Sequence, residues 1–184
     1  MKTENTALYI LRLALTLFLI AAVVAAALAG VNSITKPVID QLNAEKTQKA
    51  IEAVLPGGFQ EELTSFDSQG GLVSRVYKGE AGYALEVLPS GFDNTITMMV
   101  GVDLEGKVLG ISIVSHTETA GLGAVAAADT AAGEAFRNQF VDASGSVAVS
   151  KDGGDLDAIT GATITSRAIC VGVNAALACV AGLN

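Results

Sequence analysis

Residues 95–114, TITMMVGVDLEGKVLGISIV, form the strongest β-hairpin signal in the sequence. Two runs rich in β-branched and other apolar residues, 95–102 and 107–114, flank a bend that contains Gly106. Two such runs on either side of a bend are typical of two antiparallel strands joined by a short turn. We therefore expect the domain to be organised around an antiparallel sheet.

Two further β-rich runs lie upstream of this hairpin, at residues 72–77 and 83–88. Turn-forming residues follow each of them, Lys78-Gly79-Glu80 and Pro89-Ser90-Gly91. The four runs predict an antiparallel meander. Its last strand should end at Ser115, so the residues that follow are expected to form a loop at the edge of the sheet.

Helices are expected on the C-terminal side of this sheet. Residues 124–140 are rich in Ala and place Phe136 and Phe140 four positions apart, which predicts one short helix with both rings on one face. Residues 146–150 are a possible strand. Residues 167–183 are apolar on nearly every side but short for a membrane span, so we expect a helix buried against the sheet. The predicted fold class is α+β.

The N-terminal part has the properties of a membrane anchor. Residues 13–31 carry no charge, and at about 1.5 Å per residue a helix of this length spans a bilayer core. A cleaved signal peptide is the alternative. We favour a retained anchor, because the run is longer than a usual signal core and no cysteine directly follows it to accept a lipid.

A juxtamembrane helix should follow the anchor. Pro37 suits the first turn of a helix, and Pro56-Gly57-Gly58 stops the apolar periodicity. The expected organisation is a tail at residues 1–6, an anchor at 7–31, a juxtamembrane helix at 32–56 and the main domain at 57–184. Basic residues flank the anchor on both sides, so the charge pattern alone does not fix its orientation.

The composition argues against nucleic-acid and metal binding. The chain has 19 acidic and 11 basic residues and a net charge of −8, which disfavours nucleic acid as a partner. Cys170 and Cys179 would lie about two and a half turns apart on one helix, too far for a disulfide. We expect buried free thiols instead. The sequence contains no CxxC or Cys/His cluster that would support a metal site.

Residues 157–166, DAITGATITS, combine hydroxyl side chains with small residues just before the C-terminal helix. Gly161 and Ala162 allow the backbone to approach a bulky ligand, and the first amides of a helix favour an anion. This pattern predicts a phosphate site beside Thr163. The alternative is helix capping by Thr165 or Ser166.

A second segment, SHTETAGLG at residues 115–123, increases the weight of this interpretation. The two segments together resemble the FMN-binding domain family, whose motifs are Asp, two variable residues and Ser/Thr-Gly-Ala-Thr, and His-x-Glu-Thr-Pro-Gly-Leu-Gly. Ala120 stands where that family usually has Pro. Gly91-Phe92-Asp93-Asn94 stands where its members commonly have Gly-Tyr-x-Gly.

The resemblance implies that FMN is joined to Thr163 through a phosphoester. It also implies a flavin transferase that takes FMN from FAD and reads the acceptor motif, Asp157, Thr160, Gly161, Ala162 and Thr163. Thr165 and Ser166 are expected to hydrogen-bond the phosphate. Contacts with the flavin ring are expected from Glu118, Thr119, Gly121 and Leu122. His116 is expected to be structural, and no residue is expected to catalyse a substrate reaction by itself.

Within the family, the resemblance is greatest to the G subunits of Rnf complexes, the ion-translocating ferredoxin:NAD oxidoreductases. It implies a flavin domain on the outer face of a prokaryotic cytoplasmic membrane, tethered in the lipid by one helix. Its expected partners are membrane and iron-sulfur subunits. Two alternatives remain, the equivalent C subunit of a sodium-translocating NADH:quinone reductase, which is typically longer, and a non-catalytic extracytoplasmic binding module.

Overall fold

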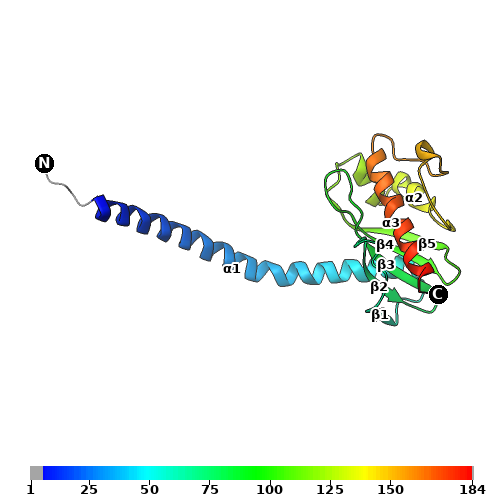
Figure 1. Ribbon diagram of the computed structural model, residues 1–184, viewed down its shortest axis with the longest axis horizontal. Coiled ribbons are helices and arrows are strands. Elements are labelled where there is room, and N and C mark those ends of the chain that lie inside the picture. Colours follow the sequence, from blue (N-terminus) through cyan, green and yellow to red (C-terminus); the bar gives the residue numbers. More distant parts are fainter. Residues whose placement is uncertain (1–5, 184) are drawn as a thin grey trace. The chain divides into compact units, whose positions relative to one another are not determined.

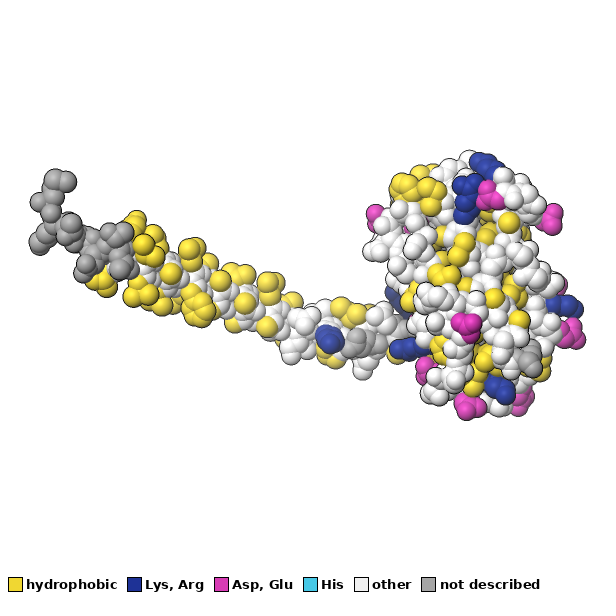
Figure 2. Space-filling view, viewed as in Figure 1, with side chains coloured by type: hydrophobic (Ala, Val, Ile, Leu, Met, Phe, Trp, Pro, Cys, Tyr) yellow, Lys and Arg dark blue, Asp and Glu magenta, His cyan; other side chains and the backbone are white. Residues whose placement is uncertain are grey.

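The computed structural model describes residues 6–183 and divides the chain into two compact units, Met1–Glu45 and Lys46–Asn184. Helix α1, Thr6–Val54, contributes to both units. Its exposed side chains in the first unit are largely apolar, as the yellow surface along the helix in Figure 2 shows. The helix is long and apolar enough to cross a membrane.

Pro37 lies inside α1, whereas the sequence pattern suggests the start of a separate helix there. Proline lacks the amide hydrogen of one helical bond, which costs about 3 kcal/mol in a helix interior. Good helix formers follow it at residues 41–53, and a long apolar run precedes it. Helix propagation on both sides therefore outweighs the single lost bond.

The second unit contains the predicted antiparallel meander. Its sheet has the order β1-β2-β3-β4-β5, with every neighbouring pair antiparallel (Figure 1). The strands are β1 (Glu61–Leu63), β2 (Val73–Lys78), β3 (Gly82–Val87), β4 (Thr97–Asp103) and β5 (Val108–Ser115). The four predicted strands are all present, and the α+β fold class is confirmed. The short strand β1 was not predicted, because two of its three residues are Glu, which is depleted in strands.

Both faces of the sheet are covered, which explains why the middle of β4 is buried on either side. Helix α3, Thr163–Ala181, covers one face, and alternate β4 residues such as Val100 join its apolar core. The last turns of α1 cover the other face, where Met99 packs with Ile51 and Val54. Gly101 permits this contact, since a Cβ there would lie 2.0 Å from the Val54 carbonyl oxygen.

Helix α3 is a core element. It meets the length and hydropathy expected of a membrane span, but 67% of its most apolar stretch is buried within the domain. Cys170 and Cys179 are both free and buried, as expected. Burial raises the pKa of the Cys170 thiol to about 11, with a smaller contribution from Asp152, and it also raises the pKa of the Cys179 thiol.

The segment between the sheet and α3 differs from the prediction of one helix at residues 124–140. It forms a 3-10 helix, η1 (Gly123–Ala127), and then a separate helix, α2 (Ala131–Asn138). Thr130 separates them, because its hydroxyl caps α2 by accepting from the Gly133 amide at 3.3 Å. Phe136 and Phe140 nevertheless form the expected pair, with ring centroids 5.5 Å apart.

Residues 146–150 do not form a regular strand. Val149 makes only an isolated parallel bridge to Leu156. A short 3-10 turn follows, η2 (Ser150–Asp152), and leads to the acceptor segment. The polar run Lys151-Asp152-Gly153-Gly154-Asp155 forms this turn and prevents extension of the bridge into a strand.

Candidate functional site

Thr163 is the first residue of helix α3, four positions earlier than the helix start predicted from the sequence. Ala162 occupies the N-cap position, and within the described residues no side chain caps this helix. Gly161 turns the chain into the helix with a φ of 78°, a conformation that favours glycine. The amides of the first turn therefore have no side-chain acceptor, and the half-buried Thr163 stands beside them.

Thr165 and Ser166 are buried and make hydrogen bonds inside the domain. The Ser166 hydroxyl accepts from the Ile159 amide at 3.0 Å and donates to the Ala162 carbonyl oxygen at 3.0 Å. The Thr165 hydroxyl donates to the carboxylate of Glu118. These bonds fix the acceptor segment on α3, and they give both hydroxyls partners other than a phosphate.

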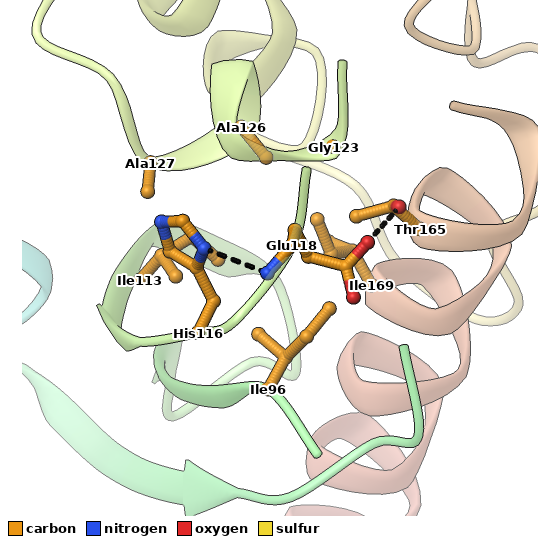
Figure 3. Close-up of a pocket in the computed structure, with 9 residues that line it drawn as sticks. All are labelled: Ile96, Ile113, His116, Glu118, Gly123, Ala126, Ala127, Thr165 and Ile169. Carbon is orange, nitrogen blue, oxygen red and sulfur yellow. Dashed lines mark hydrogen bonds between the residues drawn. The ribbon is translucent and has the colours of Figure 1, made fainter. Parts of the chain in front are cut away.

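Glu118 joins three segments of the chain at one buried carboxylate. Its Oε2 accepts from Thr165, as Figure 3 shows. Its Oε1 accepts from the backbone amide of Phe92 at 2.8 Å and from that of Asp93 at 3.4 Å. Only 8% of the residue is exposed. The carboxylate thus holds the loop after Gly91 and the start of α3 against the loop at residues 116–123.

His116 supports Glu118 from the opposite side. Its Nδ1 accepts from the backbone amide of Glu118 at 3.2 Å (Figure 3). In neutral imidazole this places the ring proton on Nε2. The contact is a local turn contact between residues two positions apart.

The two sequence motifs meet at one pocket with an empty volume of about 400 Å³. Several predicted site residues line it, namely Glu118, Thr119, Leu122, Gly161, Ala162 and Thr165. Thr163 adjoins this lining in the sequence. Thr163 itself is not part of the lining, and neither are the other predicted residues, Asp157, Thr160, Gly121 and Ser166.

An apolar rim surrounds this pocket. It consists of Phe92, Leu122 and Ile164, whose exposed fractions are 65%, 42% and 50%. Phe92 and Ile164 were not predicted as site residues. Phe92 stands out in the sequence only as a departure from the family loop, and Ile164 lies in the acceptor segment without a polar group to mark it.

Charged residues beside Thr163 were not predicted either. The Lys151 ammonium donates to the Thr163 hydroxyl at 3.4 Å. Arg167 makes a bidentate ion pair with Asp152, with both N···O distances at 2.6 Å. This pair lowers the pKa of Asp152 and raises that of Arg167. These contacts join η2 to α3, and their partners lie 12 and 15 positions apart in the sequence. No local sequence pattern indicates such a pairing.

Comparison with known proteins identifies two family regions, an FMN-binding domain at residues 91–178 and the RnfG N-terminal region at residues 1–54. The G subunit of the Na(+)-translocating ferredoxin:NAD(+) oxidoreductase complex of Acetobacterium woodii is 32% identical over 90% of this chain and 88% of the relative. The G subunit of the ion-translocating oxidoreductase complex of Methanosarcina acetivorans is 31% identical over 91% of this chain and 93% of the relative.

The chain belongs to the family of these G subunits. A further member, the G subunit of the proton-translocating ferredoxin:NAD(+) oxidoreductase complex of Clostridium ljungdahlii, is 40% identical over 52% of this chain and 51% of its own. In the present chain the FMN-binding region begins at Gly91, at the start of the loop that Glu118 holds, and ends within α3. It therefore includes every residue that lines the pocket between the two motifs.

The residues at this site fit an FMN group. The uncapped start of α3 and the Lys151 ammonium suit a phosphate at Thr163. The apolar rim suits the faces of an aromatic ring. Backbone also approaches the pocket closely at Gly161, where a Cβ would lie 2.9 Å from Leu122 Cδ2. Within the described residues no cluster of three metal-ligating side chains occurs.

Proposed function

We propose that this chain is a membrane-anchored flavoprotein subunit that relays electrons between other subunits of an ion-translocating ferredoxin:NAD oxidoreductase, with FMN attached covalently to Thr163. The observation that carries the proposal is the meeting of the two motif loops at one pocket beside a threonine at the start of α3. The names of the relatives supply the redox reaction.

The start of α3 favours a phosphoester for electrostatic reasons. The amides of its first turn carry the positive end of the helix dipole, and an anion there is stabilised by roughly 0.3–1 kcal/mol at an exposed site. Gly161 and Ala162 place no bulky side chain between these amides and the solvent. The Thr163 hydroxyl is thus positioned where an attached phosphate gains both hydrogen bonds and charge stabilisation.

The apolar rim of the pocket would hold the flavin ring, which is the end of FMN remote from the phosphate. FMN supplies the capacity to accept and release electrons singly or in pairs. Phe92, Leu122 and Ile164 would cover one side of the ring and leave its other side open to a partner. Electron relay needs this combination, because a ring enclosed on all sides would be far from the next redox centre.

The acceptor loop is accessible to a modifying enzyme. Asp157 and Thr160 are exposed, as is Gly161. The side chain of Gln139 makes two hydrogen bonds to the backbone of Asp157. The Asp157 amide donates to Gln139 Oε1 at 2.7 Å, and Gln139 Nε2 donates to the Asp157 carbonyl oxygen at 3.3 Å. The carboxylate of Asp157 is therefore presented on a fixed backbone. We propose that a flavin transferase reads this surface.

Helix α1 provides the attachment to the membrane. We propose that it crosses the membrane once and carries the flavin domain on the outer face of the cytoplasmic membrane, in contact with lipid and with the other subunits. Its apolar, exposed side chains support this arrangement. Anchoring confines the flavin close to the membrane-embedded subunits with which it exchanges electrons.

The decisive experiment is to change Thr163 to Val and measure covalent flavin. The full-length protein is co-expressed with a flavin transferase, purified in detergent and analysed by intact-protein mass spectrometry and by flavin fluorescence after denaturation. We expect the parent to carry one FMN and Thr163→Val to carry none. Thr64→Val, at an exposed site in a different loop, is the matched control and should load fully.

Two results would contradict the proposal. A parent protein that is colourless after denaturation would favour a binding module without flavin. An FMN adduct that persists in Thr163→Val would place the attachment at another hydroxyl. The folding of each variant is checked by circular dichroism. We expect unchanged spectra, because Thr and Val side chains have nearly the same shape.

A further inference from the structure

The turn η2, Ser150–Asp152, is held firmly in place beside the acceptor threonine. The Ser150 amide donates to the Leu156 carbonyl oxygen at 2.7 Å. Gly153 ends the turn with a φ of 86°. Gly154 fits closely against the preceding segment, since a Cβ there would lie 2.0 Å from the Ala148 carbonyl oxygen. The backbone that carries Lys151 is thus fixed by its own hydrogen bonds and packing.

An ion pair attaches this turn to α3. Asp152 binds the Arg167 guanidinium through both carboxylate oxygens at 2.6 Å. Arg167 lies one helical turn after Thr163, so the pair sets the distance between η2 and the start of α3. It also neutralises Asp152, whose charge would otherwise oppose an anion at this point.

Lys151 is then the cation directed at the acceptor. Its ammonium donates to the Thr163 hydroxyl at 3.4 Å, a long hydrogen bond to a neutral partner. The same loop carries the exposed carboxylates of Asp155 and Asp157. An anion attached to Thr163 would therefore enter acidic surroundings in a chain whose net charge is −8. A cation beside Thr163 would offset these carboxylates.

We infer that Lys151 is the counter-charge of the phosphodiester at Thr163, a positioning residue that holds the attached group against η2. The inference rests on the function proposed above. A phosphodiester carries one negative charge and non-bridging oxygens, which accept a charge-assisted hydrogen bond from an ammonium better than a hydroxyl does. Asp152 and Arg167 act indirectly, because they keep the turn that carries Lys151 in place.

The test is a double-mutant cycle on stability. Lys151→Gln is introduced into the flavin-loaded parent and into Thr163→Val, and urea midpoints of the full-length proteins are measured in detergent. We expect Lys151→Gln to lower the midpoint of the loaded protein and to leave that of Thr163→Val nearly unchanged. Lys151→Arg should keep the parent midpoint, because it preserves the charge. Lys107→Gln, a lysine in the hairpin after β4, should show no dependence on flavin.

A second readout detects the phosphate directly. The ³¹P resonance of the attached group should move in Lys151→Gln and stay close to its parent position in Lys151→Arg and Lys107→Gln. Equal effects of Lys151→Gln on the midpoint in both backgrounds, or an unmoved ³¹P resonance, would overturn the inference while leaving the flavin assignment intact. Absence of FMN from the parent in the mass spectrum would overturn the proposed function and this inference together.

Discussion

Glu118 belongs to a predicted flavin-binding motif, but its carboxylate holds the loops of the site together. The sequence predicts it as a site residue, and it lines the pocket between the two motifs. Its carboxylate oxygens, however, are bonded to Phe92, Asp93 and Thr165. Those partners are 25 to 47 residues away, and only the folded chain reveals them. Resemblance to a motif identified the residue but not its role in joining the loops.

The glycines around this carboxylate lead to a prediction at the scale of single residues. A Cβ at Gly123 would lie 2.5 Å from Glu118 Oε2 and 2.6 Å from the Thr165 hydroxyl. We expect Gly123→Ala to destabilise the domain by about 1–3 kcal/mol through overpacking. Urea unfolding should show a smaller effect of Gly123→Ala in a Glu118→Ala background, where the carboxylate is removed and the Thr165 hydroxyl loses the partner that holds it beside Gly123.

Gly121→Ala is the matched control for this prediction. Gly121 has a φ of 75° and open space around its Cβ position, so alanine there is strained by backbone conformation alone, by about 1–2 kcal/mol. Its cost should be the same with and without Glu118. If the cost of Gly123→Ala were also independent of Glu118, the close packing at the carboxylate would not be what requires glycine.

At the scale of elements, strands were easier to predict than the segments that build the site. The hairpin of β4 and β5 was visible because apolar runs and a Gly-containing bend are local signals. The break between η1 and α2 depends on the cap at Thr130, which an Ala-rich helical pattern conceals. The early start of α3 was missed because three of its first four residues, Thr163, Thr165 and Ser166, carry hydroxyl groups and resemble a loop.

The contact between η2 and α3 should depend on pH. The hydrogen bond and charge of Arg167 lower the pKa of Asp152 from its ordinary value of 3.8. A carboxyl whose folded-state pKa is lowered contributes its stabilisation above the unfolded-state value, and this contribution is lost as the pH falls through the folded-state pKa. We therefore expect the contact to be intact at neutral pH and to weaken only in strong acid, below pH 3.8.

NMR titration of the Asp152 carboxyl carbon measures this dependence. In Arg167→Gln the pKa should return towards its ordinary value, because the partner is removed. Lys107→Gln should leave the Asp152 titration unchanged, because Lys107 pairs instead with Glu105 in the hairpin. A pKa of Asp152 that is the same in the parent and in Arg167→Gln would show that the ion pair does not persist in solution.

For the whole molecule, the sequence predicted the order of segments better than the limits of the compact domain. The apolar N-terminal helix and the α+β domain are both present. The main domain was expected to begin at residue 57, whereas the compact unit is Lys46–Asn184. The reason is that Ile51, Val54 and Leu55 cover one face of the sheet. Helical periodicity identifies such residues as apolar but does not specify the surface against which they pack.

Two truncations test the contribution of these helical turns. A chain that begins at Lys46 should fold, because it keeps the whole compact unit. A chain that begins at Gly57 should expose Tyr77, Ala84 and Met99, and should aggregate or unfold at a lower temperature. Thermal unfolding and size-exclusion chromatography compare the two. Equal melting temperatures would mean that the end of α1 adds nothing to the fold.

The position of α3 in the chain imposes an order on maturation. This helix follows all five strands of the sheet in the chain, and it supplies both the cover over one face of the sheet and the threonine at its own first turn. The acceptor turn therefore acquires its shape only after the five strands of the sheet have been synthesised. A transferase that requires this shape would label completed molecules and pass over nascent or misfolded ones. Attachment of the cofactor would then serve as quality control before the protein joins a larger assembly.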